Sequence, residues 1–65
     1  MNNIKHFLEK KGIKQTLLAN KLGKSYNMVN SYVQNRRQPS IEDLFKIANI
    51  LGVKPSELIN DDLNN

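Results

Sequence analysis

The chain has 65 residues, enough for one small domain and too few for two. It contains no cysteine, which excludes disulfides and thiolate metal sites, and no apolar run approaches the roughly 18 residues of a membrane-spanning helix. The start of the chain, MNNIKHFLEKKG, is amphipathic and charged and does not resemble a signal peptide, so we expect a cytoplasmic protein.

The charged residues are unevenly placed along the chain. Residues 1–37 hold eight Lys and Arg against one acid, a net charge of +7, whereas residues 38–65 hold two lysines against five acids, a net charge of −3, which together give +4. A basic first half and an acidic second half indicate one face that attracts a polyanion such as nucleic acid. The alternative is that these charges belong to an ordinary solvated surface. A nucleic-acid-binding function therefore also needs support from the motif and the fold.

Apolar residues recur at three- and four-residue spacing, no stretch alternates as a strand does, and proline and glycine are sparse, which predicts an all-α domain. The first helix is expected over about residues 3–11, with Asn2 or Asn3 as its cap and Gly12 just past its end. Its apolar stripe consists of Ile4, Phe7 and Leu8.

Two further helices follow closely. One is expected over about residues 15–22, and the next starts after Ser25, a good N-cap, and ends at Asn35, which tolerates left-handed backbone. Gly23 lies between them, where a positive φ costs little. The side chains expected to face inward are Leu18, Ala19, Leu22, Val29, Tyr32 and Val33.

The second half of the chain predicts a longer helix and a short one. Ser40, which follows Pro39, caps a helix over residues 41–51. The broad apolar face of this helix comprises Ile41, Leu44, Phe45, Ile47, Ala48 and Leu51. Pro55 suits the first turn of a fifth helix over about residues 55–59. We expect the domain to span residues 1–60 and the polar residues 61–65 to fray.

The short connection between the second and third helices is typical of a helix-turn-helix unit, here residues 15–34. Such a unit needs a small residue where the helices cross, which Ala19 supplies, and a tolerant turn residue, which Gly23 supplies. It also needs apolar residues facing one another, namely Leu18, Leu22, Val29 and Tyr32. Because residues of the required type stand at all these positions, the pattern is a specific indication of a helix-turn-helix.

The chain resembles the Cro/C1-type helix-turn-helix domain (XRE family) of lambdoid phage repressors and restriction–modification controller proteins over residues 12–58, GIKQTLLANKLGKSYNMVNSYVQNRRQPSIEDLFKIANILGVKPSEL. The resemblance implies a compact, lambda-repressor-like bundle of five helices. It also implies a bacterial or phage-encoded regulator that binds operator DNA sequence-specifically as a homodimer and needs no cofactor.

The resemblance assigns roles to individual positions. Gln15 matches a glutamine that touches a DNA phosphate and buttresses the recognition helix. Tyr26 and Asn27 match positions that meet base edges. Asn30 and Ser31 match positions that reach bases or the flanking backbone. In the loop that follows, Asn35 and Arg36 match positions that hold phosphates.

The chain departs from the family pattern in places. The family often has Glu-Asn-Gly where this chain has Val33, Gln34 and Asn35. Because the acid that commonly pairs with a nearby arginine is missing, Arg36 and Arg37 could both contact DNA.

The chemistry of the third helix agrees with this resemblance. Amides and hydroxyls weaken a helix but suit base edges: asparagine pairs with adenine, serine bonds to several bases, and methionine meets a thymine methyl. Basic side chains position the protein on phosphates, and a helix N-terminus favours an anion. The expected DNA-binding residues are therefore Gln15, Lys24, Ser25, Tyr26, Asn27, Met28, Asn30, Ser31, Asn35, Arg36 and Arg37.

These side chains also have simpler interpretations. Asn27 and Asn30 could be solvated, Ser31 could face a neighbouring helix, and Ser25 could do no more than cap. His6 has no second metal ligand at useful spacing, and Asp61-Asp62 has too few oxygens for calcium, so no metal site is expected.

A homodimer would place two recognition helices in successive major grooves. The expected interface lies in the second half, at Ile50, Val53, Pro55, Leu58 and Ile59, although these residues could simply close the monomer core. A dimer bound over a promoter would exclude RNA polymerase. A dimer bound beside a promoter could recruit the polymerase.

Three alternatives remain open from the sequence. An antitoxin of a toxin–antitoxin pair would bind DNA through the same fold. A protein-interaction module would keep the fold without binding DNA, which the basic first half argues against. An enzyme is disfavoured by the lack of cysteine, the single histidine and the absence of a convergent carboxylate pair.

Overall fold

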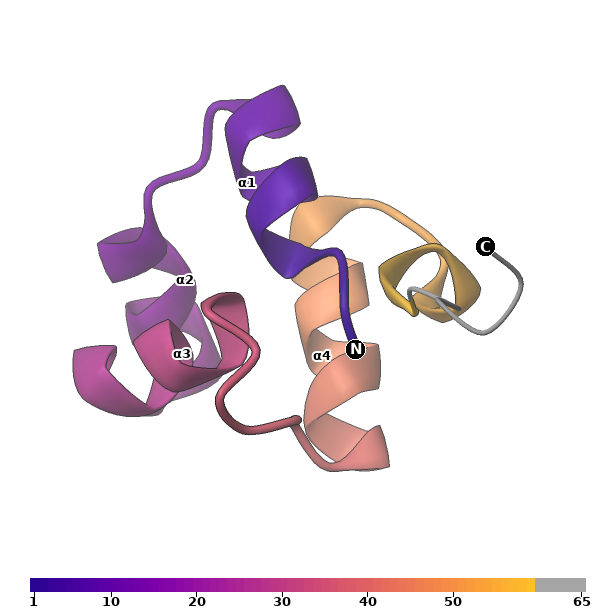
Figure 1. Ribbon diagram of the computed structural model, residues 1–65. Helices are drawn as coiled ribbons and strands as arrows, with labels where there is room; N and C mark the ends of the chain where they lie inside the picture. The colour runs from indigo at the N-terminus through magenta and orange to yellow at the C-terminus, as the bar shows by residue number, and fades with distance from the viewer. Residues whose placement is uncertain (60–65) are drawn as a thin grey trace.

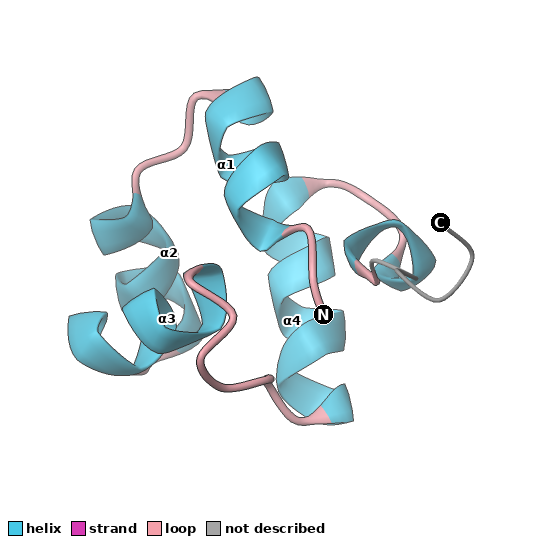
Figure 2. Cartoon of the chain, viewed as in Figure 1, coloured by secondary structure: helices cyan, strands magenta, loops and turns pink. Residues whose placement is uncertain are grey.

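The computed structural model describes residues 1–59 of the chain, which form four α-helices followed by a short 3₁₀ turn (Figure 1). The elements are α1 (Ile4–Lys11), α2 (Gln15–Leu22), α3 (Tyr26–Val33), α4 (Ile41–Leu51) and η1 (Pro55–Leu58). Short loops join them, and no strand is drawn in the described part of the chain (Figure 2). The all-α prediction is confirmed. The expected fraying of residues 61–65 lies outside the described residues, as does residue 60.

The predicted count of five α-helices is wrong, because the last element is a single 3₁₀ turn. A 3₁₀ helix is the usual form for so short a segment. After Leu58 the backbone of Ile59 turns to an extended conformation and forms an antiparallel bridge with Asn2. The Asn3 N–H donates to the Leu58 carbonyl at 2.8 Å, so the two ends of the described chain are joined.

Side chains cap the helices largely where the sequence predicts. The Ser25 and Ser40 hydroxyls accept hydrogen bonds from the Met28 and Asp43 N–H groups, each at 3.1 Å. At α1 the cap is the side chain of Asn2, whose Oδ1 accepts from the Ile4 N–H at 3.0 Å. These bonds satisfy backbone donors that the first turn of a helix leaves unpaired.

The core lies between the helices and contains residues from all five elements. It comprises Ile4, Leu8, Leu18, Ala19, Leu22, Val29, Tyr32, Val33, Ile47, Ala48, Leu51 and Leu58. All six residues expected to face inward from α2 and α3 belong to it. The helix-turn-helix therefore packs through the predicted side chains.

The apolar face predicted for α4 is too broad. Ile41 and Phe45 are 76% and 57% exposed, whereas Ile47, Ala48 and Leu51 are buried and Leu44 is half-buried. Phe45 and Ile41 lie outside the arc of α4 that meets the core, and Ile41 is the first residue of the helix. With Ile59, the described surface of the second half thus carries three exposed large apolar side chains.

Candidate nucleic-acid interface

A tight turn over residues 23–25 connects α2 to α3. Gly23 adopts φ 72°, a left-handed conformation that glycine accepts without strain, and the Lys24 N–H donates to the Ala19 carbonyl at 3.1 Å. Ala19 is buried next to this turn. The turn fixes the angle between the two helices and leaves the first turn of α3 facing solvent.

The side chains at the start of α3 are exposed, and those one turn later are partly covered. Lys24, Ser25, Tyr26 and Asn27 are exposed, with Tyr26 showing half of its surface. Met28, Asn30 and Ser31 are half-buried, while Val29 is completely buried and holds the helix against the core. The outward face of α3 is therefore polar at its N-terminal end.

Six of the predicted DNA-binding residues line one open depression of about 450 Å³ between α3 and the loop that follows it. They are Ser25, Asn27, Met28, Ser31, Arg36 and Arg37. This depression presents an amide, two hydroxyls, a thioether and two guanidinium groups at one place. These are groups suited to base edges and phosphates. We call it the α3 depression.

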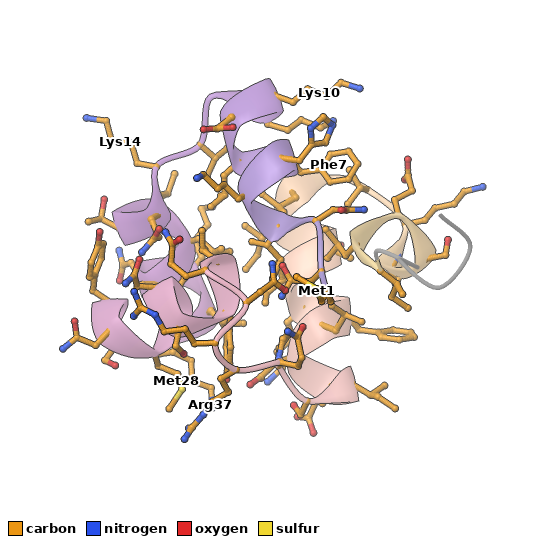
Figure 3. The ribbon with its side chains drawn as sticks, viewed as in Figure 1. Met1, Phe7, Lys10, Lys14, Met28 and Arg37 are labelled. Atoms are coloured by element: carbon orange, nitrogen blue, oxygen red, sulfur yellow. The ribbon has the colours of Figure 1, made fainter. Side chains whose placement is uncertain are left out.

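The Met28 thioether lies within the α3 depression beside a guanidinium group. Arg37 Nη1 donates to Met28 Sδ at 3.5 Å, and Ser31 Oγ donates to the Met28 carbonyl. Figure 3 shows the two labelled side chains, Met28 and Arg37, next to each other at the same edge of the molecule. Arg37 is therefore held beside α3, although it belongs to the loop.

Gln15 is the predicted site residue that joins α2 to α3. Its Nε2 donates to Asn30 Oδ1 at 3.0 Å, and both side chains are half-buried. The contact agrees with the expected buttress of the recognition helix. The bond uses the Oδ1 atom of Asn30, so the Nδ2 group of the same amide can still donate to another acceptor.

Two further predicted DNA-binding side chains, those of Asn35 and Lys24, also have partners within the protein. The Asn35 side chain bonds to Asn2 and Gln38, and its backbone has φ 60°, as predicted for the end of the third helix. Lys24 Nζ lies 3.4 Å from Asp43 Oδ2, which partly neutralises its charge. The amide contacts of Asn35 had no signal in the sequence, because its partner Asn2 is 33 positions away.

Three of the eight basic residues of the first half lie on different sides of the molecule (Figure 3), whereas the charge pattern alone indicates one basic face. In Figure 3, Lys10 and Arg37 lie at opposite ends of the molecule, and Lys14 projects from a third side. Lys10 instead lies over the Phe7 ring, with Nζ 5.9 Å from the ring centroid. Lys24 just before α3 and Arg36 and Arg37 just after it carry positive charge at the two ends of this helix.

The residues predicted for a dimer interface have unequal exposure. Ile59 is 56% exposed, and Ile50, Val53 and Pro55 are half-buried. Leu58 is 0% exposed and belongs to the core, so it has no surface to offer a partner, contrary to the prediction. Ile41 and Phe45, which the sequence places on the apolar face of the fourth helix, are more exposed than any of these residues.

No helix within residues 1–59 has the length and apolarity needed to cross a membrane. The same residues contain no cluster of three or more His, Cys, Asp or Glu with the proximity needed to hold a metal ion.

A helix of this arrangement, polar at its exposed N-terminal end and buttressed by the preceding helix, defines a helix-turn-helix protein. The model of the helix-turn-helix family HTH_3 matches residues 4–58, and the chain belongs to this family, in its Cro/C1-type branch. The family and fold support a DNA-binding regulator.

A solved structure extends the comparison. A Bacteroides fragilis protein, described as a candidate DNA-binding protein, superposes with a TM-score of 0.91 and 40% sequence identity. The similarity covers 92% of this chain and 97% of that one. None of the curated proteins compared with the chain matches it significantly.

Proposed function

We propose that the protein is a sequence-specific transcriptional regulator that inserts α3 into the major groove of a palindromic or pseudopalindromic operator. The observation that carries this proposal is the α3 depression, where six polar, thioether and guanidinium side chains meet at one exposed edge. An α-helix fits the major groove, and each base pair presents a distinct pattern of donors and acceptors there.

The side chains of α3 supply the sequence-dependent contacts. Asn27 is exposed at the mouth of the α3 depression and can pair with adenine through both groups of its amide. Tyr26, Met28, Asn30 and Ser31 extend this surface along the helix and reach thymine methyl groups, base edges or the adjacent backbone.

The remaining contacts position the protein on the DNA backbone. Arg36 and Arg37 are exposed in the loop after α3 and neutralise phosphates. Gln15, Lys24 and Ser25 lie at the starts of α2 and α3, where free N–H groups and the helix dipole favour a phosphate. We assign Asn35 to this phosphate-binding loop as well.

The regulator acts as a homodimer in this proposal. One recognition helix contacts only a few base pairs, and two related helices fit half-sites about 34 Å apart. The partner is a second copy of the chain, because operator symmetry demands the same surface twice. The interface is expected on α4, η1 and the residues next to them, where Phe45 and Ile59 are exposed and Ile50, Val53 and Pro55 are half-buried.

Selection of bound duplexes from a randomised DNA library tests the proposal without assuming an operator. We expect a palindromic or pseudopalindromic site that binds about a thousandfold or more tightly than a scrambled duplex, with an affinity that falls steeply as salt rises. Equal binding to all duplexes, or no binding at low salt, would contradict the proposal. Transcription from a promoter carrying the site would then distinguish repression from activation.

A further inference from the structure

Asn2 is a buried polar residue outside the helix-turn-helix, with only 6% of its surface exposed. Its Nδ2 donates to the Tyr32 carbonyl at the end of α3 and to Gln38 Oε1 in the following loop, both at 2.9 Å. Its Oδ1 accepts from the Ile4 N–H at 3.0 Å. One side chain therefore joins α1, α3 and the loop between α3 and α4.

The backbone of Asn2 holds the same loop a second time. The Asn2 N–H donates to Asn35 Oδ1 at 2.8 Å, and the Asn2 carbonyl accepts from Asn35 Nδ2 at 3.3 Å. Gln38 Nε2 also donates to Asn35 Oδ1 at 3.0 Å, which closes a network of three amide side chains. On its other side, Asn2 pairs with Ile59, so the network is anchored to the end of the domain.

Arg36 and Arg37 lie between the two loop residues that this network fixes, Asn35 and Gln38. Their N–H groups both donate to the Ser31 carbonyl, at 2.9 and 3.2 Å. The Arg37 side chain is held beside Met28 in the α3 depression. The network thus sets the direction in which the loop presents two exposed guanidinium groups, while Asn2 itself is too buried to touch a ligand.

We infer that Asn2 is a positioning residue for DNA binding, which acts through Asn35 and Gln38 to orient Arg36 and Arg37 toward the phosphate backbone. The inference rests on the proposed function. Its physical basis is that a loop held in one conformation loses less conformational entropy when its side chains bind. An amide network whose central member, Asn2, is buried and whose other members, Asn35 and Gln38, both bond to it is stiff enough to supply that order.

Two substitutions each remove part of the network and leave the other local contacts in place. Asn35→Gly removes the amide bonds but keeps the turn, because glycine adopts a φ of 60° without strain. Asn2→Ser keeps an oxygen near the Ile4 N–H but cannot reach Tyr32 and Gln38. Asn3→Ala is the matched control, since the Asn3 amide bonds only to the Glu57 carbonyl at 3.1 Å among described residues.

Affinity for the selected operator, measured at several salt concentrations on protein shown to be folded, tests the inference. We expect Asn35→Gly and Asn2→Ser each to weaken binding about tenfold and to reduce the slope of log affinity against log salt by about one, as for one lost phosphate contact. Asn3→Ala should leave both quantities unchanged. A purely structural role would change the folded fraction and leave the salt slope of the folded protein unaltered.

A background lacking both arginines separates positioning from other effects. In Arg36→Ala, Arg37→Ala protein, Asn35→Gly should cause no further loss of affinity, because the side chains that it positions are gone. An undiminished loss in that background, or unchanged affinity and slope in folded Asn35→Gly and Asn2→Ser, would overturn the inference and leave the proposed function standing. Failure of the parent protein to select any DNA would overturn both.

Discussion

Gln15 at the start of α2 donates its side-chain N–H to Asn30 in α3 at 3.0 Å. This bond joins the two helices of the motif at a half-buried position. It means that the orientation of the helix proposed to enter DNA depends on a side chain from the helix before it.

Replacing Gln15 by Ala should therefore weaken DNA binding and slightly destabilise the fold. One hydrogen bond contributes about 0.5–1.5 kcal/mol to the free energy of unfolding, which urea denaturation can measure. Asn20→Ala, at an exposed position on the same helix, is the control. If Gln15→Ala binds the operator as tightly as the parent protein, the buttress has no role in recognition.

Asn27→Ala should reduce the preference for the operator without changing stability. Asn27 is exposed, so its truncation leaves no buried group unpaired. A bidentate pair with adenine contributes about 1–3 kcal/mol of discrimination between bases. Competition between operator and scrambled duplexes measures that preference directly.

Asn49→Ala, exposed on α4, provides the control for this experiment. An equal loss of affinity for operator and scrambled DNA would argue that Asn27 contacts the DNA backbone and not a base.

Arg36→Ala and Arg37→Ala should weaken binding to all duplexes alike. Each removes one phosphate contact, so each should lower the slope of log affinity against log salt by about 0.9. Lys10→Ala removes the same charge at the opposite end of the molecule (Figure 3) and should change the slope little. Similar effects from Lys10 and Arg37 would show that only net charge matters.

Phe45→Glu should dissociate the proposed homodimer and leave the monomer folded. Phe45 is 57% exposed, so a charged side chain at this position lowers the free energy of unfolding of the monomer only slightly. The same charge disrupts an apolar interface. Sedimentation equilibrium measures the association, and the loss of a two-half-site footprint on the operator gives an independent reading.

Leu17→Glu is the control, because Leu17 is an exposed apolar residue of α2. A dimer that persists in Phe45→Glu and dissociates in Leu17→Glu would move the interface away from α4.

The sequence alone determined the helices and much of the candidate site. The periodicity and caps predicted α2 and α4 with their observed bounds, and Ser25, Ser40 and Asn35 end or start elements as expected. These features are local, because a cap or a turn involves residues only a few positions apart. The composition of the third helix and of the loop after it likewise indicated the residues that line the α3 depression.

Only the tertiary structure decided which of those residues remain available to a ligand. It buried Leu58, exposed Phe45, paired Lys24 with Asp43 and engaged the Asn35 amide with Asn2. The spacing along one helix cannot reveal these outcomes, because each depends on side chains brought together from distant parts of the chain. The physical reason is that burial and hydrogen bonding are satisfied by whichever partner the packing provides, however far away it lies in the sequence.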